Sequence, residues 1–249
     1  MVARSAIPGF GLAMARLFTI QAAWTYERML GIGFGFAAEP MLRGLRRDGG
    51  TEAFHGAVAR ESRFFNAHPY FASLAVGAAV RAELDGVPPE KIERLRSALS
   101  GPLGSLGDRL IWAGWLPACA AIALILVALG AGPWAVVAFL VLYNVAHVRL
   151  RVWGLRAGFR SGMGVAGALS TPGLQRALEL VSPVAAFLVG GALVSVLAWI
   201  PVHGRWETAA GAAAALLFAG AVRAIQPRAT GMVVAGGVLA VVLALGVLW

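Results

Sequence analysis

The sequence is poor in cysteine, in lysine and in charge. Its single cysteine, Cys119, lies in an apolar stretch, so one chain can form neither a disulfide nor a cysteine metal cluster. Lys91 is the only lysine among 21 basic residues, and the arginines lie between apolar runs instead of forming one basic face, which argues against a nucleic-acid partner. Charged residues make up 13% of the chain, against roughly 25% in ordinary soluble domains. An ordinary soluble domain is therefore excluded.

Patterns for catalysis and metal binding are also missing from the sequence. It has no phosphate-binding loop ending in Gly-Lys-Ser/Thr, no nucleophile with an obvious base, and no histidine pair at metal spacing. We therefore expect no catalytic residues, no metal and no cofactor.

Apolar runs dominate what is present, since hydrophobic residues make up 59% of the chain and the mean hydropathy is +0.76. The predicted spans are Trp112 to Gly130, Pro133 to Val148, Leu180 to Ile200, Glu207 to Val222 and Gly231 to Trp249. Several are shorter than the roughly 20 residues that a perpendicular crossing needs, so we expect three to five true crossings. The predicted fold class is an all-α integral membrane protein with several transmembrane helices.

The chain divides by composition into three segments. Residues 1–50 form an amphipathic N-terminal segment, residues 51–163 a core with the first spans, and residues 164–249 the C-terminal spans. Arginines fill the loop from Arg149 to Arg176, whereas the loop from Pro201 to Trp206 holds only Arg205. Because arginine-rich loops stay on the cytoplasmic side during insertion, we expect a cytoplasmic N-terminal half and an extracytoplasmic C-terminus in the cell (inner) membrane.

Two apolar segments, Phe64 to Val80 and Leu99 to Gly114, are interrupted by proline or glycine. Paired interruptions of this kind indicate the binding region of a transporter, because unwound backbone supplies hydrogen-bonding groups near the middle of the membrane. The alternative is that both segments are turns at the membrane surface. The candidate substrate or translocation residues at the two breaks are Asn66, His68, Gly101, Pro102, Gly104, Gly107 and Asp108. Asp108 could instead cap a helix, and Asn66 and His68 could instead fix the backbone around Pro69.

Four stretches of the chain occur in the order and at the spacings of one membrane family. They are AWTYERMLGIGF from Ala23, FFNAHPYF from Phe64, LSGPLGSLGD from Leu99 with Trp112, and Tyr143-Asn144 followed by RVWGLRAGFRSG from Arg151. Through them the chain resembles the IID membrane component of the mannose/fructose/sorbose phosphotransferase system, in detail over roughly residues 16–162.

The resemblance implies a membrane subunit that moves a sugar inward together with a IIC partner, in a hetero-oligomer surrounded by lipid. Separate soluble IIA and IIB proteins would relay phosphate from phosphoenolpyruvate to the sugar, and the IID chain would carry no phosphorylated residue. Departures from the family pattern at Arg109, Leu116-Pro117 and His147 motivate an alternative. In that alternative the chain keeps the fold as a transport-inactive binding, regulatory or assembly protein.

Four more polar residues are expected to act in packing or at interfaces. Glu27 and Arg28 would form an intersubunit or intramembrane pair, or lie solvated at the membrane surface. Asn144 is expected to hydrogen-bond across a helix interface, with sugar contact as the alternative. Arg151 belongs to the family-like stretch and is expected to be structural.

Overall fold

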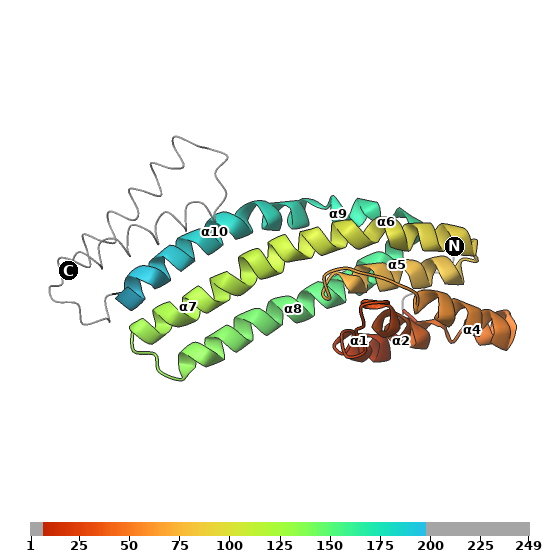
Figure 1. The fold of residues 1–249 in the computed structure, drawn as a ribbon, viewed down its shortest axis with the longest axis horizontal. Coiled ribbons are helices and arrows are strands. Elements are labelled where there is room, and N and C mark those ends of the chain that lie inside the picture. Colours follow the sequence, from red (N-terminus) through yellow and green to blue (C-terminus); the bar gives the residue numbers. More distant parts are fainter. Residues whose placement is uncertain (1–6, 198–249) are drawn as a thin grey trace. The chain divides into compact units, whose positions relative to one another are not determined.

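The computed structural model describes residues 7–197, and these residues form helices joined by short loops (Figure 1). The elements are α1 (Phe10–Leu17), α2 (Gly31–Leu42), α3 (Leu45–Asp48), α4 (Gly50–Glu61), α5 (Ala72–Leu84), α6 (Pro89–Gly107), the π-helix η1 (Asp108–Trp115), α7 (Leu116–Ala128), α8 (Trp134–Ser161), the 3-10 turn η2 (Gly162–Gly164), α9 (Ala166–Leu169) and α10 (Pro172–Leu197). The all-helical fold class is confirmed over this part of the chain.

Three continuous helical stretches within residues 7–197 are long and apolar enough to cross a membrane: Pro89–Ala128, Trp134–Gly164 and Pro172–Val196. They contain most of the predicted spans that begin at Trp112, Pro133 and Leu180. The predicted spans at Glu207 to Val222 and Gly231 to Trp249 lie outside the described residues, as does Arg205. The helices therefore agree with an integral membrane protein.

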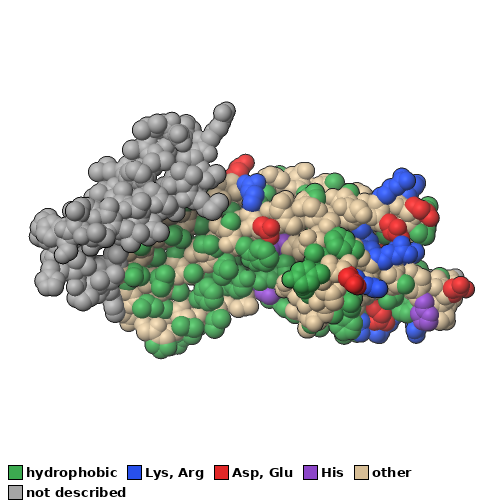
Figure 2. Space-filling model, viewed as in Figure 1, with side chains coloured by type: hydrophobic (Ala, Val, Ile, Leu, Met, Phe, Trp, Pro, Cys, Tyr) green, Lys and Arg blue, Asp and Glu red, His purple; other side chains and the backbone are tan. Residues whose placement is uncertain are grey.

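The chain forms two compact units. One comprises residues 1–120 and 136–187, and the other comprises residues 121–135 and 188–249. All of the candidate residues lie in the first unit. Charged side chains on the visible face of that unit gather over α4 and the beginning of α6, whereas the side of α8 is largely hydrophobic (Figure 2). The division of the sequence into three segments stays a prediction.

Helix α5 is the centre of the first unit, since every residue from Phe71 to Val80 is buried. Glycines let α8 approach it closely: a Cβ at Gly158 would overlap the carbonyl of Leu74, and one at Gly154 would overlap the hydroxyl of Ser73. Small residues four positions apart are the usual means by which helices in membranes bring their backbones together. The tight contact between α5 and α8 fixes the position of the chain just before α5.

That preceding stretch is the first predicted break, and it is present. Residues 62–71 leave the helical conformation between α4 and α5. The N-terminal loop meets the freed backbone: Leu30 N–H donates to the carbonyl of Phe65 (2.9 Å), and Phe65 N–H donates to the carbonyl of Arg28 (3.3 Å). Burial in protein thus supplies the hydrogen bonds that hydrocarbon would not.

The second predicted break, at Leu99 to Asp108, is wrong, because the backbone there does not leave the helical conformation. Helix α6 continues through Gly101, Pro102, Gly104 and Gly107 and passes directly into η1. Leu99, Leu103 and Gly107, four residues apart, are buried on one face of it, so packing outweighs the poor helix propensity of glycine and proline. The irregularity begins at Asp108, where the helix becomes π-helical, a change that occurs frequently at functional sites.

Candidate functional site

The first break packs on the glycine-rich face of α6. Ser100 on α6 donates a hydrogen bond through its hydroxyl to the carbonyl of Asn66, whose own side chain is exposed. Gly104 lies beside the same break, and a Cβ at Gly107 would overlap the imidazole of His68. Four of the predicted residues, from two separate segments, are therefore brought together: Asn66, His68, Gly104 and Gly107.

His68 is almost fully enclosed, with 2% of its surface exposed. Its Nδ1 accepts a hydrogen bond from the backbone N–H of Tyr70 (3.3 Å), which assigns the proton of the neutral ring to Nε2. That Nε2 is buried and has no hydrogen-bond partner within residues 7–197. Burial, and then the positive charge of Arg151, lower the pKa of His68 to about 4. At neutral pH the ring is therefore uncharged and offers one unpaired N–H donor.

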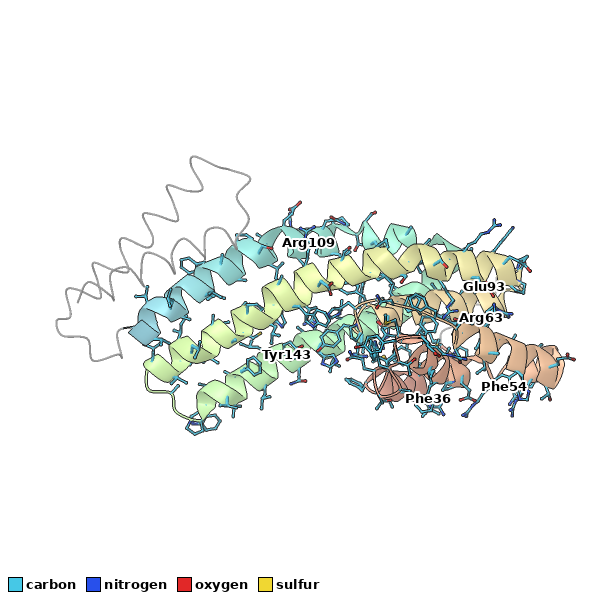
Figure 3. The ribbon with its side chains drawn as sticks, in the orientation of Figure 1. Phe36, Phe54, Arg63, Glu93, Arg109 and Tyr143 are labelled. Atoms are coloured by element: carbon cyan, nitrogen blue, oxygen red, sulfur yellow. The ribbon has the colours of Figure 1, made fainter. Side chains whose placement is uncertain are left out.

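Aromatic rings and an arginine surround this histidine. The ring of Trp112, on η1, lies edge-on to His68 with 4.8 Å between centroids. Tyr70 stacks on His147 of α8 with 4.0 Å between centroids and 9° between planes. The hydroxyls of Tyr70 and Tyr143 are 2.6 Å apart, at hydrogen-bond distance. Figure 3 shows Tyr143 on α8.

Arg151 ties the same cluster to the N-terminal part of the chain. It is 2% exposed, donates from Nε to His147 Nε2 (2.7 Å), and donates from Nη1 to the carbonyl of Leu17. Its guanidinium lies 4.9 Å above the ring of Tyr70. The predicted structural role of Arg151 fits these contacts, because one side chain joins α8, α1 and the break.

Sequence reasoning did not assign Tyr70, Tyr143 or His147 to the site. A signal was available, because Tyr143, His147 and Arg151 recur every four residues along α8 and such residues share one helix face. Tyr70 follows His68 by two residues, inside the motif that carries the family resemblance. We define the α8 cluster as Tyr70, Tyr143, His147 and Arg151.

The remaining predicted residues lie elsewhere on the first unit. Gly101 and Pro102 are exposed on α6. Asp108 is exposed and forms no cap, because it lies inside one continuous helix that passes from α6 into η1. Asn144 donates to the carbonyl of Leu140 in its own helix (2.8 Å), where a bond to another helix was expected.

Glu27 and Arg28 both have exposed side chains in the loop before α2, and no ion pair joins them. Of the two expectations for this pair, the solvated position agrees with the exposure.

The base of the break contains a buried contact between Arg96 and Glu61 that sequence reasoning also missed. Arg96 of α6 is 4% exposed and donates to the carbonyls of Arg60 and Glu61, at the end of α4, and of Arg63, just beyond it. Its Nε lies 3.2 Å from Oε2 of Glu61, a side chain with no exposed surface. Arg63 also pairs with Glu93 near the surface (Figure 3). Arg96 thus anchors the chain at the point where the break begins.

No group of three or more His, Cys, Asp or Glu side chains within residues 7–197 could hold a metal ion. What the site offers is one unpaired N–H donor, tyrosine hydroxyls and aromatic faces. Apolar rings with a few hydrogen-bonding groups can recognise an uncharged polar ligand.

The sequence and the fold were compared with known proteins. A family model, that of the PTS system mannose/fructose/sorbose family IID component, matches residues 10–249. The mannose-specific EIID component of Escherichia coli (strain K12) is 29% identical over 68% of this chain and 61% of its own length. The sorbose-specific EIID component of Klebsiella pneumoniae is 28% identical over 74% of this chain and 66% of its own length. The chain thus aligns with about three fifths to two thirds of these relatives.

Two solved structures share the fold. A chain of the cryo-EM structure of the mannose transporter ManYZ in complex with microcin E492 superposes with a TM-score of 0.56 and 26% identity, covering 78% of this chain and 70% of that one. A second, described as the structure of a membrane protein, superposes with a TM-score of 0.66 and 21% identity over 95% of this chain and 94% of that one.

Proposed function

The chain belongs to the mannose/fructose/sorbose family of PTS IID components, and from that membership we propose that it is the IID subunit of a sugar permease. It forms the sugar path together with a IIC chain and is not itself phosphorylated. Soluble IIA and IIB proteins transfer phosphate to the arriving sugar. The complex lies in the cell inner membrane, with the N-terminal half of this chain on the cytoplasmic side.

The observation that carries the proposal is the unpaired N–H of His68 where the break, α6 and the α8 cluster meet. A sugar hydroxyl is an acceptor for this donor, and a buried donor without a partner costs about 1–3 kcal/mol. The ring of Trp112 beside it, which is 52% exposed, provides an apolar surface for a sugar ring. Asn66 and Asp108, exposed on the same unit, supply further polar groups along the path.

Sugar uptake in cells that also carry the IIA, IIB and IIC proteins tests the site. His68→Leu removes the donor, so we expect uptake to fall at least about fivefold, whereas His68→Gln keeps an N–H and retains more activity. Arg94→Gln, on the exposed surface of α6, is the matched control and leaves uptake unchanged. Normal membrane levels of each variant show that folding is not the cause.

Two further variants test the outer part of the path. Full uptake by the Asn66→Ala and Asp108→Ala variants would show that neither residue belongs to the sugar path. If the unaltered chain supports no uptake of any hexose or amino sugar beside its IIC partner, the transport proposal fails and a binding or assembly role replaces it.

The partner and the absence of phosphorylation are tested directly. We expect the chain to co-purify with a candidate IIC protein. We also expect no label on it after incubation with radioactive phosphoenolpyruvate and the soluble phosphocarriers, while IIA and IIB become labelled. A labelled IID chain would contradict the non-phosphorylated role.

A further inference from the structure

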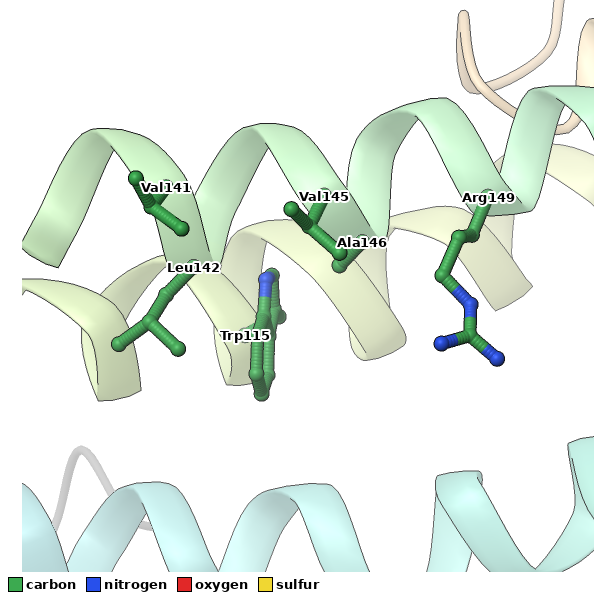
Figure 4. Close-up of a pocket in the computed structure, with 6 residues that line it drawn as sticks. All are labelled: Trp115, Val141, Leu142, Val145, Ala146 and Arg149. Carbon is green, nitrogen blue, oxygen red and sulfur yellow. The ribbon is translucent and has the colours of Figure 1, made fainter.

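An apolar pocket of about 370 Å³ lies between α8 and Trp115 of η1, and no residue of the α8 cluster lines it. It is lined by Trp115, Val141, Leu142, Val145, Ala146 and Arg149 (Figure 4). All six residues belong to the first unit. We call this surface the Trp115 groove; its volume lies within the roughly 300–1,000 Å³ usual for small-molecule sites.

The walls of the groove match a hydrocarbon chain. Val141 and Val145 follow one another at four-residue spacing and expose 54% and 51% of their surfaces. The indole of Trp115 stands across the groove from α8 (Figure 4). Eight residues separate Val141 from Arg149, so the lined stripe is about 12 Å long. A straight, narrow ligand fits a stripe of this form.

Arg149 provides the only charge in the groove. Its side chain is exposed and makes no hydrogen bond or ion pair with any residue from 7 to 197. It also lies about 22 Å along α8 from Trp134 at the start of the helix, within the roughly 30 Å thickness of the hydrocarbon core. Arg149 directly follows the apolar run that ends at Val148, and an arginine at the end of such a run extends its guanidinium to the phosphate level of the membrane.

We propose that the Trp115 groove is a binding site for an anionic phospholipid. One acyl chain lies along Val141 and Val145 against the indole of Trp115, and the phosphate pairs with Arg149. Charge complementarity favours this ligand over a neutral lipid. Besides Arg149, the lining side chains offer one polar group, the indole N–H of Trp115, which is too few for a sugar. The site is separate from the proposed sugar path, since its residues are not those that surround His68.

Quenching of tryptophan fluorescence by acyl-brominated lipids tests the site on the full chain in detergent. The signal is the part of the emission that disappears in Trp115→Phe. We expect brominated phosphatidylglycerol to quench it at roughly fivefold lower concentration than brominated phosphatidylcholine. A difference of this size is what the attraction between one basic side chain and an anionic headgroup provides. Arg149→Gln should abolish that difference, and Ala146→Phe, which fills the groove, should weaken quenching by both lipids.

Arg160→Gln is the matched control, because Arg160 is an exposed arginine on the same helix outside the groove. It should retain the preference for phosphatidylglycerol. The proposal is overturned if Arg149→Gln and Arg160→Gln reduce the preference equally, or if the unaltered chain does not distinguish the two lipids. It is also overturned if a IIC chain, and not lipid, protects the thiol of a Val145→Cys variant from modification.

Discussion

Burial acts in opposite directions on two side chains of the first unit. It lowers the pKa of His68 to about 4 and raises the pKa of Glu61 to about 8, because in both cases the charged form is the one that loses hydration. Neither carboxylate oxygen of Glu61 has a hydrogen-bond partner within residues 7–197. Arg96, beside it, is already held by three carbonyls and lies 4.9 Å from the ring of Phe34. A neutral Glu61 therefore suits its surroundings.

Stability is expected to fall as the pH rises from about 5 to about 8. In that window an unfolded Glu61, with its ordinary pKa of 4.5, releases its proton while the folded one keeps it, so deprotonation favours the unfolded chain. Glu61→Gln mimics the protonated form and should flatten this dependence. Thermal unfolding in detergent at pH 4 and pH 9 measures it, with the variant close to the unaltered chain at pH 4 and more stable at pH 9.

The control for this experiment is Glu93→Gln, which removes a carboxylate partly exposed at the surface and paired with Arg63. Surface pairs of this kind contribute about 0–1 kcal/mol, so the pH dependence should remain. An unaltered pH profile in Glu61→Gln would show that Glu61 is ionised throughout.

Gly107 is expected to tolerate no side chain. A methyl group there overlaps the imidazole of His68, so Gly107→Ala should displace His68 and reduce both stability and sugar uptake. Gly56, in α4, has no atom within 4 Å of an added Cβ, and Gly56→Ala should stabilise the chain by roughly 0.5–1 kcal/mol. Thermal unfolding of the two variants in parallel separates the local overlap from the general effect of glycine in a helix. Equal stabilisation by both would contradict the packing of the break on α6.

At the scale of elements, the break depends on α6 for its beginning as well as its middle. Arg96 holds the last carbonyls of α4, and Ser100 binds the carbonyl of Asn66 one turn later. The glycine-rich face of α6, at Gly104 and Gly107, then accommodates His68. Helix α6 thus binds the irregular backbone of the break at successive turns. These contacts require α6 itself to be continuous.

Arg96→Met should detach the end of α4 from α6. Removing the guanidinium leaves three carbonyls without a donor, and each buried acceptor left unpaired costs about 1–3 kcal/mol. Hydrogen exchange should become faster over residues 60–68, where the break begins. Arg94→Met, on the exposed side of the same helix, should leave exchange unchanged. Faster exchange spread evenly over all helices would instead indicate general destabilisation.

For the whole molecule, hydrophobic runs predicted the described spans, because length and apolar content are required by the membrane itself. The first break was also predictable, since Pro69 follows a polar group inside an apolar run. The continuity of α6 was not, because glycine and proline signal only local preference, while Leu99 and Leu103 bury enough surface to keep the helix. Tyr70 and His147 meet across 77 positions of sequence, and only the contact between α5 and α8 brings them together.

The arginines predict how the molecule lies in the membrane. Arg149, Arg156 and Arg160 occupy the C-terminal half of α8, while the turn before it, residues 129–133, carries no charge. The positive-inside rule therefore places the end of α8 in the cytoplasm and the turn outside. A membrane-impermeant maleimide tests this in a chain whose single cysteine, the buried Cys119, is replaced by alanine. Ala131→Cys should react in intact spheroplasts, and Ser161→Cys only after the membrane is opened; the reverse pattern would invert the proposed orientation.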